Sequence, residues 1–126
     1  MKRFFTLLTV GALLSSFTFF SSIEEVITAM KAGSAADIAR FFDNTVELNM
    51  PDKSNSYSKS QGELVLRDFF TTNVVKSFIV NHKGENSNSQ FCIGTLVTKN
   101  GTYRTTIYIK LKGDKQLLQT ITFEKQ

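Results

Sequence analysis

The chain has 126 residues, of which 15 are basic and 11 acidic, and it contains one histidine, one cysteine and one proline. This length fits one domain at most, the single cysteine excludes an internal disulfide, and the scattered charges exclude the basic stripe of a nucleic-acid-binding protein. A lone histidine also argues against a catalytic zinc site, which needs several protein ligands. We expect no cofactor, metal or nucleic acid to bind, and we interpret Cys92 as a small buried strand residue.

The first segment has the pattern of a secretory signal peptide. Met1 to Arg3 is a short basic start, and residues 4–20 are uncharged and apolar, broken only by Gly, Ser and Thr. This pattern predicts that residues 1–22 are removed near Ser21-Ser22 and that residues 23–126 are exported to the bacterial periplasm or secreted. A membrane anchor is the alternative, but the run is short for a spanning helix. After cleavage no membrane partner is expected.

Two short helices are predicted next. Ser22 to Glu25 has the Ser-x-x-Glu form of a capping box. Apolar residues then recur along one helical face: Ile23, Val26, Ile27 and Met30. Gly33 ends this helix, because glycine adopts the left-handed conformation that follows many helices. Residues 34–37 start a second, shorter helix that buries Ile38, Phe41 and Phe42.

The middle of the chain predicts one strand, one loop and one helix. Residues 44–50 alternate apolar and polar side chains, which is typical of a half-buried strand, and Pro51 closes it. Residues 52–60 are small and polar and read as a loop. A second capping box, Ser60 to Glu63, opens a helix whose apolar residues are Leu64, Leu66, Phe69 and Phe70.

The remaining third of the chain is rich in strand signals. Residues 74–80 predict a strand, and its alternation places His82 in line with Phe78 and Val80, close to the strand end. Residues 84–89 predict a turn. Residues 89–125 predict an antiparallel three-stranded meander, because β-branched and aromatic residues are interrupted by Asn100-Gly101 and by Gly113-Asp114. Helices early and antiparallel strands late favour an α+β fold with helices on one face of one sheet.

The meander has two apolar faces. A two-residue turn at Asn100-Gly101 pairs Lys99 with Thr102 and puts Cys92 and Ile107 on the helix-covered side. The opposite side is more apolar than a solvated face should be, since it carries Phe91, Ile93, Val97 and Tyr108.

The register of the last strand stays open at this point. A two-residue turn at Gly113-Asp114 places Leu117, Ile121 and Phe123 on the Tyr108 side, and one extra residue moves them to the Ile107 side. In the first register the outer face is a large apolar patch, which usually marks an interface. We therefore predict a homodimer through the open sheet face.

Four segments carry a resemblance to a known superfamily: IEEVITAMKAGSAADIARFF, VELNM, GELVLRDFF and YRTTIYIKLKGDKQLLQTITFEK. Over residues 22–125 the chain resembles the nuclear transport factor 2-like superfamily, and more closely a family of small exported bacterial proteins of unknown function with that fold. The resemblance implies a cone-shaped roll on one strongly curved, mainly antiparallel sheet. It also implies a conical pocket, which is an active site, a ligand site or simply filled, and dimers through the outer sheet.

Few residues are candidates for chemistry. Asp43 and His82 are weak candidates for a general base within the cone. Candidate walls of a ligand pocket, which could equally fill the cone, are Phe41, Phe42, Phe69, Phe70 and Ile107. No Gly-rich phosphate loop and no nucleophile elbow is present in the sequence.

Three hypotheses follow from this inventory. The first is a non-enzymatic exported roll that binds a small apolar ligand or a protein partner. The second is an isomerase- or hydrolase-like enzyme that uses Asp43 or His82 as its base. The third is a purely structural dimer with a packed interior. A cavity above about 300 Å³ lined by the phenylalanine pairs would favour ligand binding.

Overall fold

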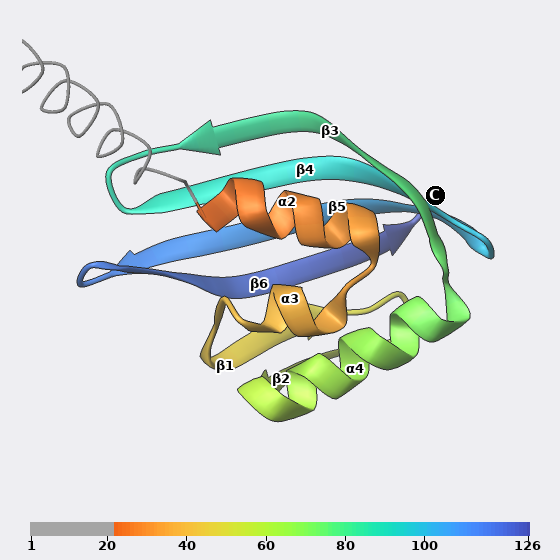
Figure 1. The fold of residues 1–126 in the computed structure, drawn as a ribbon, viewed down its shortest axis with the longest axis horizontal. Helices are drawn as coiled ribbons and strands as arrows, with labels where there is room; N and C mark the ends of the chain where they lie inside the picture. The colour runs from red at the N-terminus through yellow and green to blue at the C-terminus, as the bar shows by residue number, and fades with distance from the viewer. Residues whose placement is uncertain (1–21) are drawn as a thin grey trace, which may run out of the picture.

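The computed structural model describes residues 22–126 (Figure 1), and the predicted signal peptide lies outside these residues except for its end at Ser22. The elements are α2 (Ser22–Ala32), α3 (Ala35–Ala39), β1 (Phe42–Asn49), β2 (Ser54–Ser58), α4 (Lys59–Thr72), β3 (Val75–Glu85), β4 (Ser89–Thr98), β5 (Gly101–Lys112) and β6 (Lys115–Lys125). Among these residues no helix is both long enough and apolar enough to cross a membrane.

The strands form one curved, six-stranded sheet in the order β2-β1-β6-β5-β4-β3, and α2, α3 and α4 lie on one of its faces (Figure 1). Only β1 and β6 run parallel, whereas the other neighbours are antiparallel. The predicted α+β roll with a mainly antiparallel sheet is therefore confirmed.

The break between the two N-terminal helices lies where the sequence predicts. The predicted extent of the second helix is wrong, because α3 ends at Ala39, Phe41 lies in the turn that follows, and Phe42 is the buried first residue of β1. Gly33 has a φ of 63°, a left-handed conformation that breaks the helix after Ala32. The Ser34 hydroxyl accepts a hydrogen bond from the Asp37 amide at 3.2 Å and caps α3. The sharp turn between the helices lets both bury their apolar faces on the same side of the sheet.

The predicted loop over residues 52–60 is wrong in part, because it contains β2. This strand pairs with β1, and Tyr57 lies opposite Val46. The cap of α4 is Ser58 and not Ser60, since the Ser58 hydroxyl accepts from the Gln61 amide at 3.3 Å. Leu64 is exposed, because it lies about 200° around the helix from the buried Leu66.

The β4–β5 turn differs from its predicted register. Thr98 pairs with Gly101, so Lys99 and Asn100 form the turn and every predicted pair is displaced by two residues. Asn100 is held there because its side-chain amide donates to the Thr72 carbonyl at 2.6 Å. A displacement by two leaves each side chain on its predicted face.

The last strand combines both registers that the sequence left open. The two-residue turn at Gly113-Asp114 places Leu117 opposite Lys110 on the outer face. A bulge between Tyr108 and Ile109 then shifts the pairing, so Ile121 and Phe123 lie on the inner face and are buried. The outer face is therefore less apolar than the first register required.

Aromatic side chains fill the inside of the roll. The rings of Phe69 and Phe123 stack with centroids 4.5 Å apart, and Phe70 and Tyr103 meet Phe69 edge-on at 5.7 and 5.2 Å. The Tyr103 hydroxyl donates to Asn73 Oδ1 at 2.9 Å, and the Asn73 side-chain amide donates to the Phe69 carbonyl at 3.1 Å. This network fixes the end of α4 against β5.

Candidate functional site

The candidate pocket walls lie mainly in the packed core. Phe42, Phe69, Phe70 and Ile107 are all buried. None of the five cavities described for residues 22–126 is lined by Phe42, Phe69 or Ile107, and Phe70 borders only a shallow 300 Å³ cleft between α3 and α4. The inside of the roll thus matches the filled alternative more closely than the open one.

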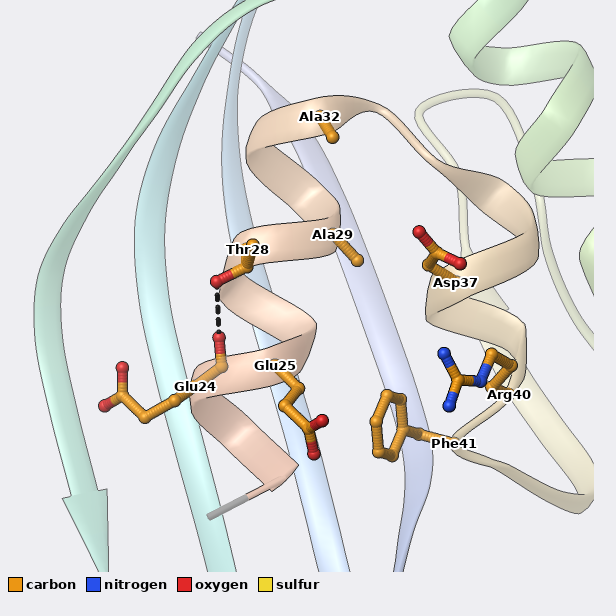
Figure 2. Close-up of a pocket in the computed structure, with 8 residues that line it drawn as sticks. All are labelled: Glu24, Glu25, Thr28, Ala29, Ala32, Asp37, Arg40 and Phe41. Atoms are coloured by element: carbon orange, nitrogen blue, oxygen red, sulfur yellow. Dashed lines mark hydrogen bonds between the residues drawn. The ribbon is translucent and has the colours of Figure 1, made fainter. Parts of the chain in front are cut away.

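Phe41 is the exception, because it lines a groove of 620 Å³ between α2 and α3 (Figure 2). We call this the helix groove, and its lining is Glu24, Glu25, Thr28, Ala29, Ala32, Asp37, Arg40 and Phe41. The guanidinium of Arg40 lies 6.0 Å from the centre of the Phe41 ring. The groove therefore combines an alanine floor and one aromatic wall with a mostly acidic rim.

Asp43 is not placed to act as a base in the cone. It follows the buried Phe42 and points to the opposite side of β1, where it lines a polar cleft of 400 Å³. Lys112 Nζ lies 2.6 Å from its carboxylate, and Gln119 Nε2 donates to it at 3.0 Å. These two bonds and the Asn44 amide lower the pKa of Asp43 to about 2. Such a carboxylate has little affinity for a proton at neutral pH.

His82 also lies away from the interior, and its predicted placement in line with Phe78 and Val80 is wrong. A bulge between Val80 and His82 changes the alternation of β3, so His82 pairs with Ile93 on the outer face. Its ring centre lies 5.5 Å from that of Phe91. The side chain of His82 is exposed. It lies within β3 and not at the end of the strand, because β3 continues to Glu85.

Cys92 is the one thiol among residues 22–126, and its surroundings do not suit a nucleophile. Cys92 is fully buried, as predicted, and burial raises the pKa of its thiol to about 11, which is unsuited to a nucleophile. Across residues 22–126 no group of three His, Cys, Asp or Glu side chains is arranged to hold a metal ion.

The outer sheet face keeps part of its apolar character. We define the outer patch as Ile79, Phe91, Ile93, Val97 and Tyr108. Ile79 and Tyr108 are exposed, and the other three are half-buried. Sequence reasoning missed Ile79, although its position between the inward-facing Phe78 and Val80 could have identified it.

Comparison with solved structures identifies close relatives. A DUF4783 family protein from Bacteroides uniformis is 32% identical, with a TM-score of 0.79 over 82% of this chain and 95% of that one. Another from Bacteroides ovatus is 34% identical, with a TM-score of 0.77 over 81% and 93%. A nuclear transport factor 2-like protein of unknown function from Cytophaga hutchinsonii is 12% identical, with a TM-score of 0.63 over 87% and 94%, and shares the fold.

The family model agrees with these structural relatives. None of the curated proteins matches this chain. The model of a domain of unknown function, DUF4783, matches residues 23–124, nearly all of the part that the structure describes. The chain therefore belongs to the DUF4783 family, and its fold is that of the nuclear transport factor 2-like roll expected from the sequence.

Proposed function

We propose that this chain is an exported, non-enzymatic association domain that forms a homodimer through the outer patch. The contrast between the two faces of the sheet supports this most directly. Packed aromatic side chains fill the inner face, whereas Ile79 and Tyr108 stay exposed on the outer patch. Apolar side chains that remain accessible on a sheet face are typical of an interaction surface.

A second copy of the chain is the partner that the outer patch fits best. In a two-fold symmetric contact the same surface meets itself, so an apolar patch is complementary to its own copy. Arg104 and Glu124 lie opposite each other on β5 and β6 at the border of the patch. A rotated copy can therefore bring opposite charges together at the rim, which favours one orientation over others.

The enzyme alternative finds less support in the geometry. Asp43 is engaged by Lys112 on the outer side of β1, and His82 lies on the outer face beside Phe91. A general base must lie within hydrogen-bond reach of the proton that it removes, inside a site that holds the substrate. Two candidates that both point away from the cone do not form such a site together.

Sedimentation equilibrium of residues 23–126 at tens of micromolar tests the dimer. The variant Ile79→Glu places a charge on the outer patch, and Leu64→Glu on α4 is its matched control, because the two side chains are 58% and 56% exposed. We expect a dimer for the wild type and for Leu64→Glu, and a monomer for Ile79→Glu. A monomeric wild type, or a dimer that survives Ile79→Glu and Tyr108→Asp, would refute the proposal.

The export that we propose is supported by the basic start at Met1 to Arg3 and the uncharged apolar run over residues 4–20. The intact mass of the protein purified from its own cell envelope tests it. We expect a mature chain that begins near Ser22. A purified protein that retains Met1 would contradict the signal-peptide interpretation and leave the dimer untouched.

Binding of a small apolar ligand is a second candidate function, favoured by the helix groove. Phe41 and the alanine floor offer an apolar surface in a groove of 620 Å³, which is within the usual size range of ligand sites. Native mass spectrometry of protein from the cell envelope would detect a retained molecule. We expect Phe41→Ala to lose it and Phe70→Leu, which changes the core, to keep it.

A further inference from the structure

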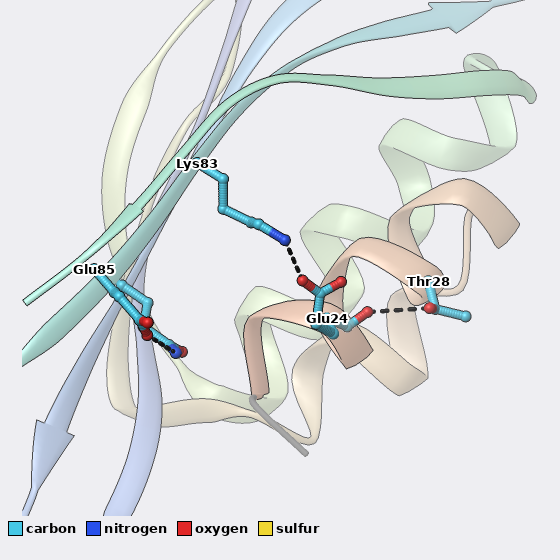
Figure 3. A network of polar contacts seen from close by, with 5 residues as sticks. Glu24, Thr28, Lys83 and Glu85 are labelled. Atoms are coloured by element: carbon cyan, nitrogen blue, oxygen red, sulfur yellow. Dashed lines mark hydrogen bonds and ion pairs between the residues drawn. The ribbon is translucent and has the colours of Figure 1, made fainter. Parts of the chain in front are cut away.

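A smaller cavity lies where the first turn of α2 meets the end of the β3–β4 hairpin. We call it the α2–β3 pocket, and it has a volume of 350 Å³ and is lined by Ile23, Glu24, Lys83, Gly84, Glu85 and Gln90. Figure 3 shows Lys83 reaching from β3 to Glu24 on α2, with Glu85 further along the same strand. The cavity is separate from the outer patch, because Lys83 and Glu85 face the helices.

Gln90 leaves one polar atom of this pocket without a partner. Its side chain is only 9% exposed, and its Nε2 donates to the Glu85 carboxylate at 3.1 Å. Its Oε1 is buried and accepts no hydrogen bond from any residue of the described chain. Buried acceptors are almost always satisfied in folded proteins, so this oxygen requires a donor other than the groups that residues 22–126 place beside it in this structure.

The charges around Gln90 indicate what kind of donor fits. Lys83 is paired with Glu24 and is therefore largely neutralised. Glu85 has no ion pair among residues 22–126, so the pocket carries one net negative charge. Glu24 and Glu25 already compensate the positive end of α2. A positively charged N–H donor would satisfy both the acceptor and the charge, whereas an anion would satisfy neither.

We propose that the α2–β3 pocket binds a primary ammonium group. The Glu85 carboxylate is one acceptor, and Gln90 Oε1 becomes the other when the Gln90 side chain turns toward the cavity. Ile23 supplies an apolar wall for a short alkyl body, and the volume suits a small amine and not a folded segment. A carboxylate and an amide oxygen together are strong acceptors for an ammonium donor. The inference is independent of the proposed homodimer, because no residue of the outer patch takes part.

The ammonium has two possible sources. One is a free small amine. The other is the α-amino group that signal-peptide removal would create near Ser22, since the Ser22 nitrogen donates to Gln116 Oε1 at 2.8 Å. Gln116 and Gln90 also line the same 90 Å³ cavity beside the pocket, so this nitrogen lies close to the site.

The test uses two forms of residues 22–126, one with a free amino group at Ser22 and one acetylated there. Each is titrated with n-butylammonium, and the side-chain amide resonance of Gln90 is followed by NMR. Tetramethylammonium has the charge but no N–H and serves as the probe control. Gln90→Leu removes the acceptor, and Gln61→Leu, on the exposed side of α4, is the matched variant.

We expect n-butylammonium to shift the Gln90 resonance saturably in the acetylated chain and tetramethylammonium not to. Gln90→Leu should weaken binding about ten-fold or more, as followed on the Glu85 amide, while Gln61→Leu should not change it. If the form with an unmodified amino group at Ser22 binds n-butylammonium as tightly as the acetylated form does, the ligand is a free amine. If the unmodified form binds it at least ten-fold more weakly, the chain's own amino group occupies the pocket. No saturable shift in the acetylated chain, or unchanged binding in Gln90→Leu, overturns the proposal.

Discussion

Replacing Tyr103 with Phe tests whether polar groups inside the roll serve stability and not chemistry. Tyr103 is 5% exposed, and its hydroxyl donates to Asn73 Oδ1 at 2.9 Å. Phenylalanine keeps the ring and its packing, so the change removes the hydrogen bond alone. Asn73 Oδ1 then keeps only the hydroxyl of Thr98, at 3.5 Å, which is a weak contact.

The expected cost follows from this geometry. Leaving a buried acceptor largely unsatisfied costs about 1–3 kcal/mol, and 1 kcal/mol lowers the Tm of a domain of this size by about 4–8 °C. We therefore expect the Tm of residues 23–126 to fall by about 4–24 °C in calorimetry. Guanidinium unfolding at 25 °C should give a lower midpoint with an unchanged m-value.

A control and a double-mutant cycle make the measurement specific. Tyr57→Phe removes a hydroxyl on the edge strand β2 that makes only a 3.4 Å contact with Asn55, so we expect its stability to stay within about 0.5 kcal/mol of the wild type. Combining Tyr103→Phe with Asn73→Ala should give a coupling energy of about 0.5–3 kcal/mol. A Tyr103→Phe variant as stable as the wild type would mean that this hydrogen bond contributes nothing to stability, and it would refute the reasoning.

Two further predictions concern a glycine and a charge. Gly94→Ala should destabilise the protein by about 1–3 kcal/mol in guanidinium unfolding. The new Cβ would lie 2.6 Å from the Phe78 ring and 2.8 Å from the Ile79 carbonyl oxygen. An unchanged unfolding midpoint would contradict this packing. The Asp43 pairing should lose about 1 kcal/mol of its contribution to stability as the pH falls from about 4 to 2, because the pKa of Asp43 is about 2 in the folded protein and 3.8 in the unfolded chain. The figure is smaller than the full conversion of this pKa difference, since solvent screens the half-exposed Lys112. Asp43→Asn should show a smaller loss of stability than the wild type over this range in urea unfolding, and an identical pH dependence of the two proteins would refute the pairing.

Local signals were enough to predict the helices and most of the strands. Gly33 and the period of the apolar residues located α2 and α3, since both are properties of a few neighbouring residues. The alternation of apolar and polar residues predicted the strand β1, and it predicted which sheet face the side chains of β4 and β5 lie on. The predicted pairing register at the Lys99-Asn100 turn was wrong, but each side chain still lies on its predicted sheet face, because the register error was an even number of residues.

The bulges in β3 and between β5 and β6 determine which sheet face several residues lie on, and the sequence did not predict these bulges. The bulge before His82 moved that residue to the outer face, and the bulge beside Tyr108 moved Ile121 and Phe123 to the inner face. A bulge is fixed by how a strand fits its neighbours, so alternation along one strand does not locate it. The change of phase becomes visible only with the burial of the residues, because Leu118 and Ile121 are both buried but lie an odd number of residues apart.

Among the described residues the cavities lie at the surface of the roll, and two of them border α2. The inner phenylalanines contact one another, and the Tyr103 hydroxyl is already bonded to Asn73, so a ligand inside would have to displace side chains. Glu24 lines both the helix groove and the α2–β3 pocket, but its carboxylate is paired with Lys83. A cation that used Glu24 would first have to break that ion pair. The selectivity of the α2–β3 pocket must therefore come from Gln90 and Glu85, whose acceptor oxygens no cation of the described chain occupies.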